Sequence, residues 1–112
     1  MGIQNKPKRG AGRRDSAANA AARRELAELI VSINDPAALE RLFDELFTRA
    51  ELLDLVLRWR LLKMLKEGMP QRMIAENLGI SLCKITRGSR VLKQPDAVIV
   101  KLLRQAGIEK GK

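Results

Sequence analysis

The segment between residues 71 and 90 constrains the fold of this chain most, because it carries two short apolar patterns separated by Gly79. A glycine can adopt a positive φ at little cost and end a helix, and Ser81 is a good N-cap for the next helix. The small Ala75 leaves room for the second helix to cross the first. The residues expected to face inward are Ile74, Ala75 and Leu78 in the first helix and Leu82, Ile85 and Gly88 in the second. The pattern predicts a helix-turn-helix.

Basic residues gather on this segment. Between residues 68 and 93, the single acid Glu76 stands against five basic residues. Any helical hairpin needs a glycine turn and an apolar interior, but a merely solvated face does not need this charge asymmetry. We therefore expect the second helix to present polar side chains to a DNA major groove. The side chains expected on or near that exposed face are Cys83, Lys84, Thr86, Arg87 and Arg90.

Composition narrows the fold and the partners. The 112 residues suffice for one domain with a modest core, and 46% of them are hydrophobic. No stretch alternates apolar and polar residues as strands do, so we expect an all-α chain. The net charge of +9 favours a polyanionic partner, and nucleic acid is favoured over a membrane surface.

Catalysis and metal binding find little support in the sequence. The chain has no histidine and no tyrosine, and so lacks the commonest general base and the commonest neutral metal ligand. Its one cysteine, Cys83, allows neither an internal disulfide nor a cysteine-rich zinc site. We expect no enzyme, no metal and no cofactor.

Apolar runs and the N-terminal segment bear on localisation. No apolar run reaches the length of a membrane span, and the basic N-terminus lacks the apolar core of a signal peptide, so we expect a cytoplasmic protein without a membrane partner. Residues 1–14 hold five basic residues and no acid, and are expected to form a disordered arm. Such an arm can bind phosphates or only confer solubility, and the sequence favours neither reading. Residues 15–112 are expected to form a single all-helical domain.

Start and stop signals divide that domain into helices. Asp15 or Ser16 can cap a first helix, whose apolar stripe ends near Ile33. Asp35 then provides an N-cap, and Pro36 suits the first position of a second helix.

A third helix has more apolar residues than one stripe can hold. Thr48 and Glu51 form a capping-box pattern at its start. Ten of the fourteen residues in 52–65 are apolar, which is too many for a single chain of six short helices to cover. We therefore expect an obligate or tightly held homodimer. A last helix is expected after residues 94–96, with the apolar residues Val98, Ile99, Leu102 and Leu103.

Several of these features together resemble the bacterial Trp repressor family. The resemblance covers roughly residues 46–103, and its most specific part is the run ITRGS that follows the turn. It implies an all-helical, intertwined homodimer of six-helix chains, in which L-tryptophan is the corepressor and the liganded dimer binds an operator to repress transcription. Genes of tryptophan biosynthesis or transport are the implied targets. The residues that carry the resemblance are Arg58, Gly68, Gln71, Arg72, Ile85, Thr86, Arg87, Gly88, Ser89, Leu92 and Lys93.

The resemblance implies a tryptophan site made by Thr48, Arg58, Arg87 and Gly88. The two arginines match residues that hold the indole ring between them, and Arg87 also pairs with the ligand carboxylate. A guanidinium suits both tasks, because it has a flat face for stacking and donors for a carboxylate. Thr48 matches a threonine near the carboxylate, and Gly88 matches a glycine that leaves room for the ring.

Each of these residues also has a plain structural reading. Thr48 can serve only as a helix cap, Gly88 as a close packing point and Arg87 as a phosphate contact. Arg58 can be a solvated or snorkelling arginine, although its place in the most apolar helix favours the ligand role.

For DNA, the resemblance and the analysis of helix faces agree on one set of residues. Arg72 is the expected base reader, because arginine can make two hydrogen bonds to guanine. Lys84 stands where the family commonly has a small polar residue. We therefore expect the preferred DNA sequence to differ from that of better-known family members. The expected DNA contacts are Gln71, Arg72, Leu82, Cys83, Lys84, Thr86 and, to backbone phosphate, Lys93.

Three departures from the family bear on ligand and operator. Val91 stands where the family often has a serine hydroxyl near the ligand amino group, and Glu45 replaces an apolar residue beside the pocket, where its carboxylate can hold an ammonium instead. The turn at residues 68–70 is one residue shorter than usual, so operator spacing is expected to differ.

Two alternatives remain open beside a tryptophan-responsive repressor. The first is a regulator that uses the same scaffold with another ligand or with none. The second is a helical module that binds nucleic acid without sequence preference.

Overall fold

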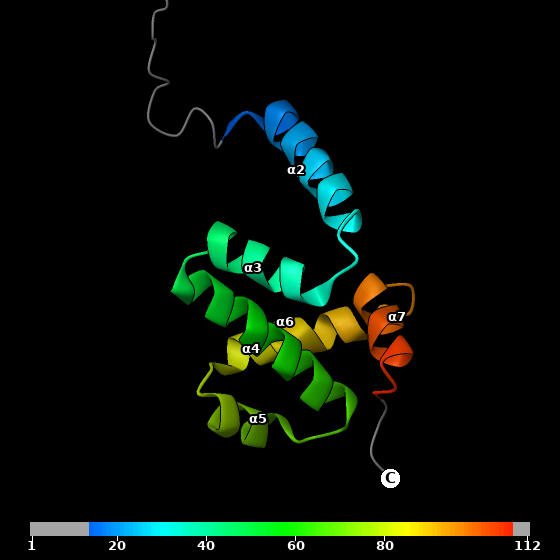
Figure 1. The fold of residues 1–112 in the computed structure, drawn as a ribbon. Coiled ribbons are helices and arrows are strands. Elements are labelled where there is room, and N and C mark those ends of the chain that lie inside the picture. The colour runs from blue at the N-terminus through cyan, green and yellow to red at the C-terminus, as the bar shows by residue number, and fades with distance from the viewer. Residues whose placement is uncertain (1–13, 109–112) are drawn as a thin grey trace, which may run out of the picture. The chain divides into compact units, whose positions relative to one another are not determined.

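The structure, a computed structural model, describes residues 14–108 as an all-helical chain without strands (Figure 1). Residues 14–46 of this range and residues 47–108 belong to two compact units, divided between Leu46 and Phe47. The single domain expected over residues 15–112 stays a prediction, and most of the expected arm at residues 1–14 lies outside the described residues. The helices are α2 (Ser16–Val31), α3 (Pro36–Leu46), α4 (Arg49–Lys66), α5 (Gln71–Leu78), α6 (Leu82–Leu92) and α7 (Val98–Gln105).

The first unit contains α2 and α3, and both begin as the sequence predicts. The Asp15 side chain caps α2, since its Oδ1 accepts a hydrogen bond from the backbone N–H of Ala18 at 2.9 Å. Helix α2 ends at Val31, two residues before the expected Ile33, because Ser32 closes the last turn with hydrogen bonds to backbone carbonyls. Asp35 Oδ1 accepts from the backbone N–H of Ala37 at the start of α3. Neither helix contains a buried residue, and among their apolar side chains Leu29 is 61% and Leu46 49% exposed.

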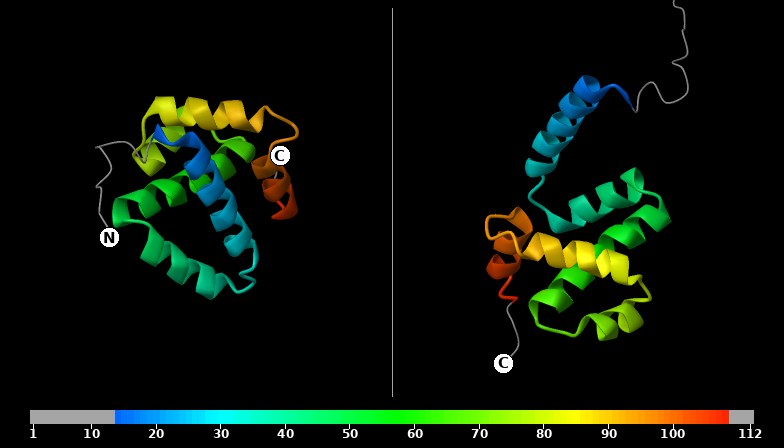
Figure 2. Two further views of the ribbon diagram at one scale, coloured as in Figure 1. Left: turned by 90° about the horizontal axis from the view of Figure 1, so that it is seen from above. Right: turned by 180° about the vertical axis from the view of Figure 1, so that it is seen from behind.

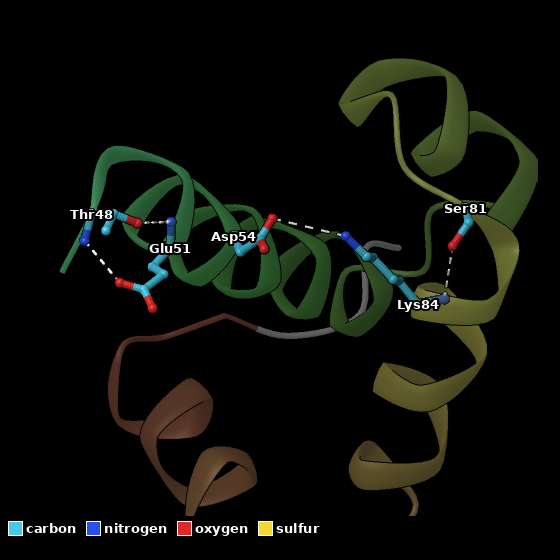
Figure 3. A network of polar contacts seen from close by, with 5 residues as sticks. All are labelled: Thr48, Glu51, Asp54, Ser81 and Lys84. Atoms are coloured by element: carbon cyan, nitrogen blue, oxygen red, sulfur yellow. Dashed lines mark hydrogen bonds and ion pairs between the residues drawn. The ribbon is translucent and has the colours of Figure 1, made fainter. Parts of the chain in front are cut away.

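The second unit is built on α4, whose first turn is fixed by the predicted capping box. Thr48 Oγ1 accepts from the backbone N–H of Glu51 at 3.1 Å, and the Thr48 backbone N–H donates to Glu51 Oε1 at 2.8 Å (Figure 3). The two bonds satisfy N–H groups that a helix end leaves without intrahelical partners. They begin an 18-residue helix in which Leu61 is the buried side chain.

The helix-turn-helix is formed by α5 and α6, which pack on each other and on α4 (Figure 2). Gly79 ends α5 with a φ of 63°, in the left-handed region that glycine enters without strain. Ser81 then caps α6, and its hydroxyl accepts from the backbone N–H of Lys84 at 3.4 Å. These three features confirm the predicted motif. The core under it consists of Leu61, Ile74, Leu78 and Ile85.

One expectation about the apolar faces is wrong. Leu82, expected to face inward, is 57% exposed, because spacing fixes only its angle around α6 and not whether another element covers it. Helix α7 buries Val100 and Leu103, whereas Val98, its first residue, is 70% exposed. None of the helices in the range 14–108 is both long enough and apolar enough to cross a membrane.

Candidate ligand pocket and nucleic-acid interface

A pocket of about 280 Å³ lies between α4 and α6 in the second unit. Its size is close to the lower end of the range for small-molecule sites, about 300 to 1,000 Å³, so it suits one small ring system. The residues that line it are Arg58, Leu61 and Leu62 from α4 and Lys84, Arg87, Gly88 and Val91 from α6.

The lining combines an apolar floor with positive charge. Leu61 and Leu62 offer hydrocarbon surface, while Arg58, Lys84 and Arg87 bring three cations, and none of the lining residues is acidic. Arginine faces stack on aromatic rings, and their N–H groups grip carboxylates. A planar aromatic molecule with an anionic group therefore matches the chemistry of this pocket.

Gly88 allows α6 to approach α4 closely and also forms part of the pocket wall. A Cβ added to Gly88 would lie 3.3 Å from Leu61 Cδ2 and from Leu65 Cδ1, and 3.4 Å from Leu62 Cδ2. Gly88 can serve both as a packing point and as part of the ligand site, because the close approach of α6 to α4 also forms the pocket wall.

Lys84 faces α4 as well as solvent. Its Nζ lies 3.8 Å from Oδ1 of Asp54, one α4 turn before Arg58 (Figure 3). Both side chains are about half exposed, at 52% for Lys84 and 54% for Asp54. The distance indicates an electrostatic contact rather than a hydrogen bond. Asp54 thus brings one negative charge near a group of three cations.

Thr48 does not line this pocket. It caps the helix that carries Arg58 and precedes Arg58 by ten residues, which at 1.5 Å per residue is a separation of about 15 Å. Within one chain its observed role is the capping box, and its ligand role stays a prediction. Glu45 belongs to α3 in the first unit, so its expected place beside the pocket also stays a prediction.

The residues expected to contact DNA are all exposed. They lie on α5 and α6, which pack on each other, and at Lys93, directly after α6. Gln71 and Arg72 occupy the first turn of α5, where their side chains are free of the core. Thr86 Oγ1 donates to the backbone carbonyl of Leu82 at 3.0 Å, so this hydroxyl has acceptor capacity left for an amino group of a base. The remaining members of the set are Leu82, Cys83 and Lys84 on α6 and Lys93 directly after it.

Three lining residues and one neighbour of the pocket, Asp54, were not predicted from the sequence. The missed lining residues share a signal, because Lys84 stands at helical spacing with Arg87 and Gly88, and Leu61 and Leu62 follow Arg58 by one turn. Asp54 had no such signal, since its contact with Lys84 joins helices 30 residues apart in sequence. Only the packing of α6 on α4 reveals it.

Comparisons with known proteins agree on one family. A family model described as Trp repressor protein matches residues 22–106. Curated proteins named Trp operon repressor homolog, from Chlamydia trachomatis serovars L2 and D, are 41% identical over 59 residues. That match covers 52% of this chain, which spans 63% of the length of those relatives.

A solved structure extends the likeness to the fold. The crystal structure of a "putative Trp repressor from Staphylococcus aureus" superposes with a TM-score of 0.73 at 28% identity. The superposition covers 81% of this chain and 91% of that one. Because the family model also matches well over half of the sequence, the chain belongs to the Trp repressor family.

Proposed function

We propose that this protein is a sequence-specific DNA-binding repressor of transcription whose affinity for its operator is raised by L-tryptophan. The observation that carries the proposal is the double use of α6. Its inner side forms one wall of the pocket through Arg87, Gly88 and Val91, while its outer side carries exposed candidates for DNA contact. A ligand in the pocket therefore contacts the helix that would enter the major groove.

The ligand proposal follows from what the pocket offers. Arg58 and Arg87 approach from the two helices, and the indole ring is proposed to lie between them above Leu61 and Leu62. Arg87 also takes the carboxylate, because a guanidinium can donate two parallel hydrogen bonds to it. No cofactor is part of the proposal, and tryptophan acts as a corepressor.

The switch requires differential binding. Tryptophan shifts the protein toward one orientation of α5 and α6 only if it binds that orientation more tightly. Thermodynamic linkage then requires that operator DNA tighten tryptophan binding by the same factor. The ligand would act as a spacer between α4 and α6 that sets the angle of the helix-turn-helix.

The DNA proposal assigns separate tasks to the exposed residues. Arg72 and Gln71 at the start of α5 are proposed to contact base edges, as are Leu82, Cys83 and Thr86 on α6, whereas Lys93 contacts phosphate. The net charge of +9 adds attraction that does not depend on sequence.

The active species is proposed to be a homodimer. Leu53, Leu55 and Val56 on α4 are 38–56% exposed in the single chain, although they belong to its most apolar helix. Exposed apolar surface of this kind marks an interaction site, and a second copy of the chain covers it most simply. A second copy would also allow Thr48 to approach a pocket that it cannot reach within its own chain.

The proposed targets are genes of tryptophan biosynthesis or transport, and the proposed compartment is the cytoplasm. A repressor of this kind needs access to the chromosome and to free tryptophan. Both are met there without any further partner.

The test is a selection of binding sites from a random duplex DNA library, run in parallel with and without L-tryptophan. Enrichment of a two-fold symmetric site only in the presence of tryptophan is the expected result, and the half-site spacing would report the dimer geometry. The tryptophan-free arm serves as the control for ligand dependence.

The two alternatives give different outcomes in the same experiment. Equal enrichment in both arms would retain a DNA reader but remove tryptophan as its switch. No enriched sequence in either arm would favour the binder without sequence preference. Salt titration would then show the steep loss of affinity typical of phosphate contacts alone.

A further inference from the structure

We propose that Lys84 is a ligand-recognising residue, which selects for a carboxylate at the mouth of the pocket, and that Asp54 holds its ammonium there until the ligand carboxylate competes for it. The inference rests on the proposed function, because it concerns the same pocket and uses L-tryptophan as the ligand. It assigns Lys84 to ligand recognition instead of base reading.

Lys84 lies on the face of α6 that points toward α4. Lys84 shares one face of α6 with Arg87, Gly88 and Val91, which follow it by three, four and seven residues. Its backbone N–H donates to the Ser81 hydroxyl, so the first turn of α6 is held in place (Figure 3). A residue on this face points toward α4.

Asp54 on α4 is the acidic residue that Lys84 contacts. It precedes Arg58 by four residues on α4, which places both on one face of that helix. Figure 3 shows the Asp54 carboxylate directed toward the Lys84 ammonium, and the two charged atoms are 3.8 Å apart. The contact therefore holds the ammonium beside the pocket rather than on the outer face of the helix-turn-helix.

The weakness of this contact allows the ammonium to change partners. Both side chains are more than half exposed, and ion pairs at such sites are screened by water and salt. A ligand carboxylate held by Arg87 inside the pocket would be less exposed to water than the Asp54 carboxylate. It would therefore attract the Lys84 ammonium more strongly. Lys84 and Arg87 together would then favour a ligand with a carboxylate over an analogue of the same shape without one.

The charge balance around the pocket leads to opposite effects for the two residues. Removing the Lys84 ammonium takes away one attraction for the carboxylate. Removing the Asp54 charge takes away a competitor for Lys84 and a repulsion of the ligand carboxylate. Loss of charge at these two positions should therefore shift ligand affinity in opposite directions, which a purely structural ion pair would not do.

The experiment measures binding of L-tryptophan and of L-tryptophanamide, which has no carboxylate, by calorimetry to the full-length protein. The variants are Lys84→Met and Asp54→Asn, and the matched control is Arg90→Met, which removes a cation from α6 outside the pocket lining. We expect Lys84→Met to weaken tryptophan binding about 3- to 10-fold and Asp54→Asn to tighten it about 2- to 3-fold, as fits partly screened charge interactions. Tryptophanamide binding should change by less than about twofold in both variants, and Arg90→Met should leave tryptophan binding unaltered.

Each outcome decides the matter. If the unaltered protein binds no tryptophan, the proposed function fails and this inference fails with it. If it binds tryptophan but Lys84→Met binds equally well, the inference alone fails. A thermal melt of each variant checks folding, and both residues are exposed enough for the fold to persist. If Lys84→Met changes the selected base sequence at saturating tryptophan without changing ligand affinity, Lys84 is a base reader and the inference is overturned.

Discussion

Arg72 and Arg87 have the same side chain, but they stand in different surroundings. Arg87 lines a pocket next to leucine side chains, whereas Arg72 lies exposed in the first turn of α5. Arginine stacks on rings and grips carboxylates in the first setting, and it reads guanine in the second. Surroundings rather than residue type separate the proposed ligand contact from the proposed base contact.

The role of Arg72 can be tested at this scale. The Arg72→Ala variant is expected to lose discrimination at one base pair of the selected site, at about 1 to 3 kcal/mol, because a bidentate contact to guanine is lost. Competition binding with single-base variants of the site measures this loss. A uniform weakening across all sequences would instead identify a phosphate contact.

Gly88 and Gly79 provide a matched pair of alanine substitutions. Gly88→Ala places a methyl group in the pocket wall, 3.3 Å from two leucine side chains, so tryptophan affinity should fall. The helical gain of alanine offsets the crowding, so the free energy of unfolding should change by less than about 1 kcal/mol.

Gly79→Ala should show the reverse pattern. Gly79 has a φ of +63° and no atom within 4 Å of an added Cβ, so the substitution strains only the backbone. We expect a loss of about 1 to 2 kcal/mol in stability with unchanged tryptophan affinity of the folded protein. Calorimetry and urea unfolding of both variants check the pair, and equal ligand affinity in Gly88→Ala would contradict its place in the pocket.

At the scale of helices, the sequence predicts starts and stops well. The caps at Asp15, Thr48 and Ser81 and the left-handed Gly79 depend on short local patterns, so they can be identified without tertiary structure. Coverage by a neighbouring helix is a tertiary property. For that reason the prediction that Leu82 faces inward was wrong, and the contact between Asp54 and Lys84 was not predicted.

Ile85 and Leu82 test how α6 is held. Both are large apolar residues of one helix, but Ile85 is fully buried and Leu82 is 57% exposed. Ile85→Ala should lower the free energy of unfolding by about 2 to 5 kcal/mol through lost burial and a cavity. Leu82→Ala should change it by less than about 0.5 kcal/mol. Urea unfolding at one fixed protein concentration measures both, and equal losses would mean that a partner chain covers Leu82.

At the scale of the molecule, part of the site depends on assembly. The pocket between α4 and α6 brings Arg58, Arg87 and Gly88 together within one chain, but it does not include Thr48. Sequence could place the first three on two helices and could not show that the fourth lies beyond their reach. The same helix α4 leaves apolar side chains exposed, which a single chain does not explain.

Self-association is the expected property of that exposed surface. Replacing Leu53 and Val56 together by serine should weaken the dimer, because both are exposed apolar residues on one face of α4. Met73→Ser is the control, since Met73 is 50% exposed but lies on α5. Sedimentation equilibrium measures the association, and an undiminished dimer in the double variant would place the interface elsewhere.

Tryptophan in the pocket and operator DNA are proposed to bind cooperatively through α6, and a DNA-binding titration in the presence of tryptophan measures that coupling. The dissociation constant for the selected DNA site is measured over a series of L-tryptophan concentrations, with the unaltered protein and with Arg58→Ala. We predict that tryptophan tightens DNA binding by the unaltered protein, and that Arg58→Ala remains a folded dimer that does not respond. A DNA affinity that is independent of tryptophan in the unaltered protein, or a normal response in Arg58→Ala, would contradict the account.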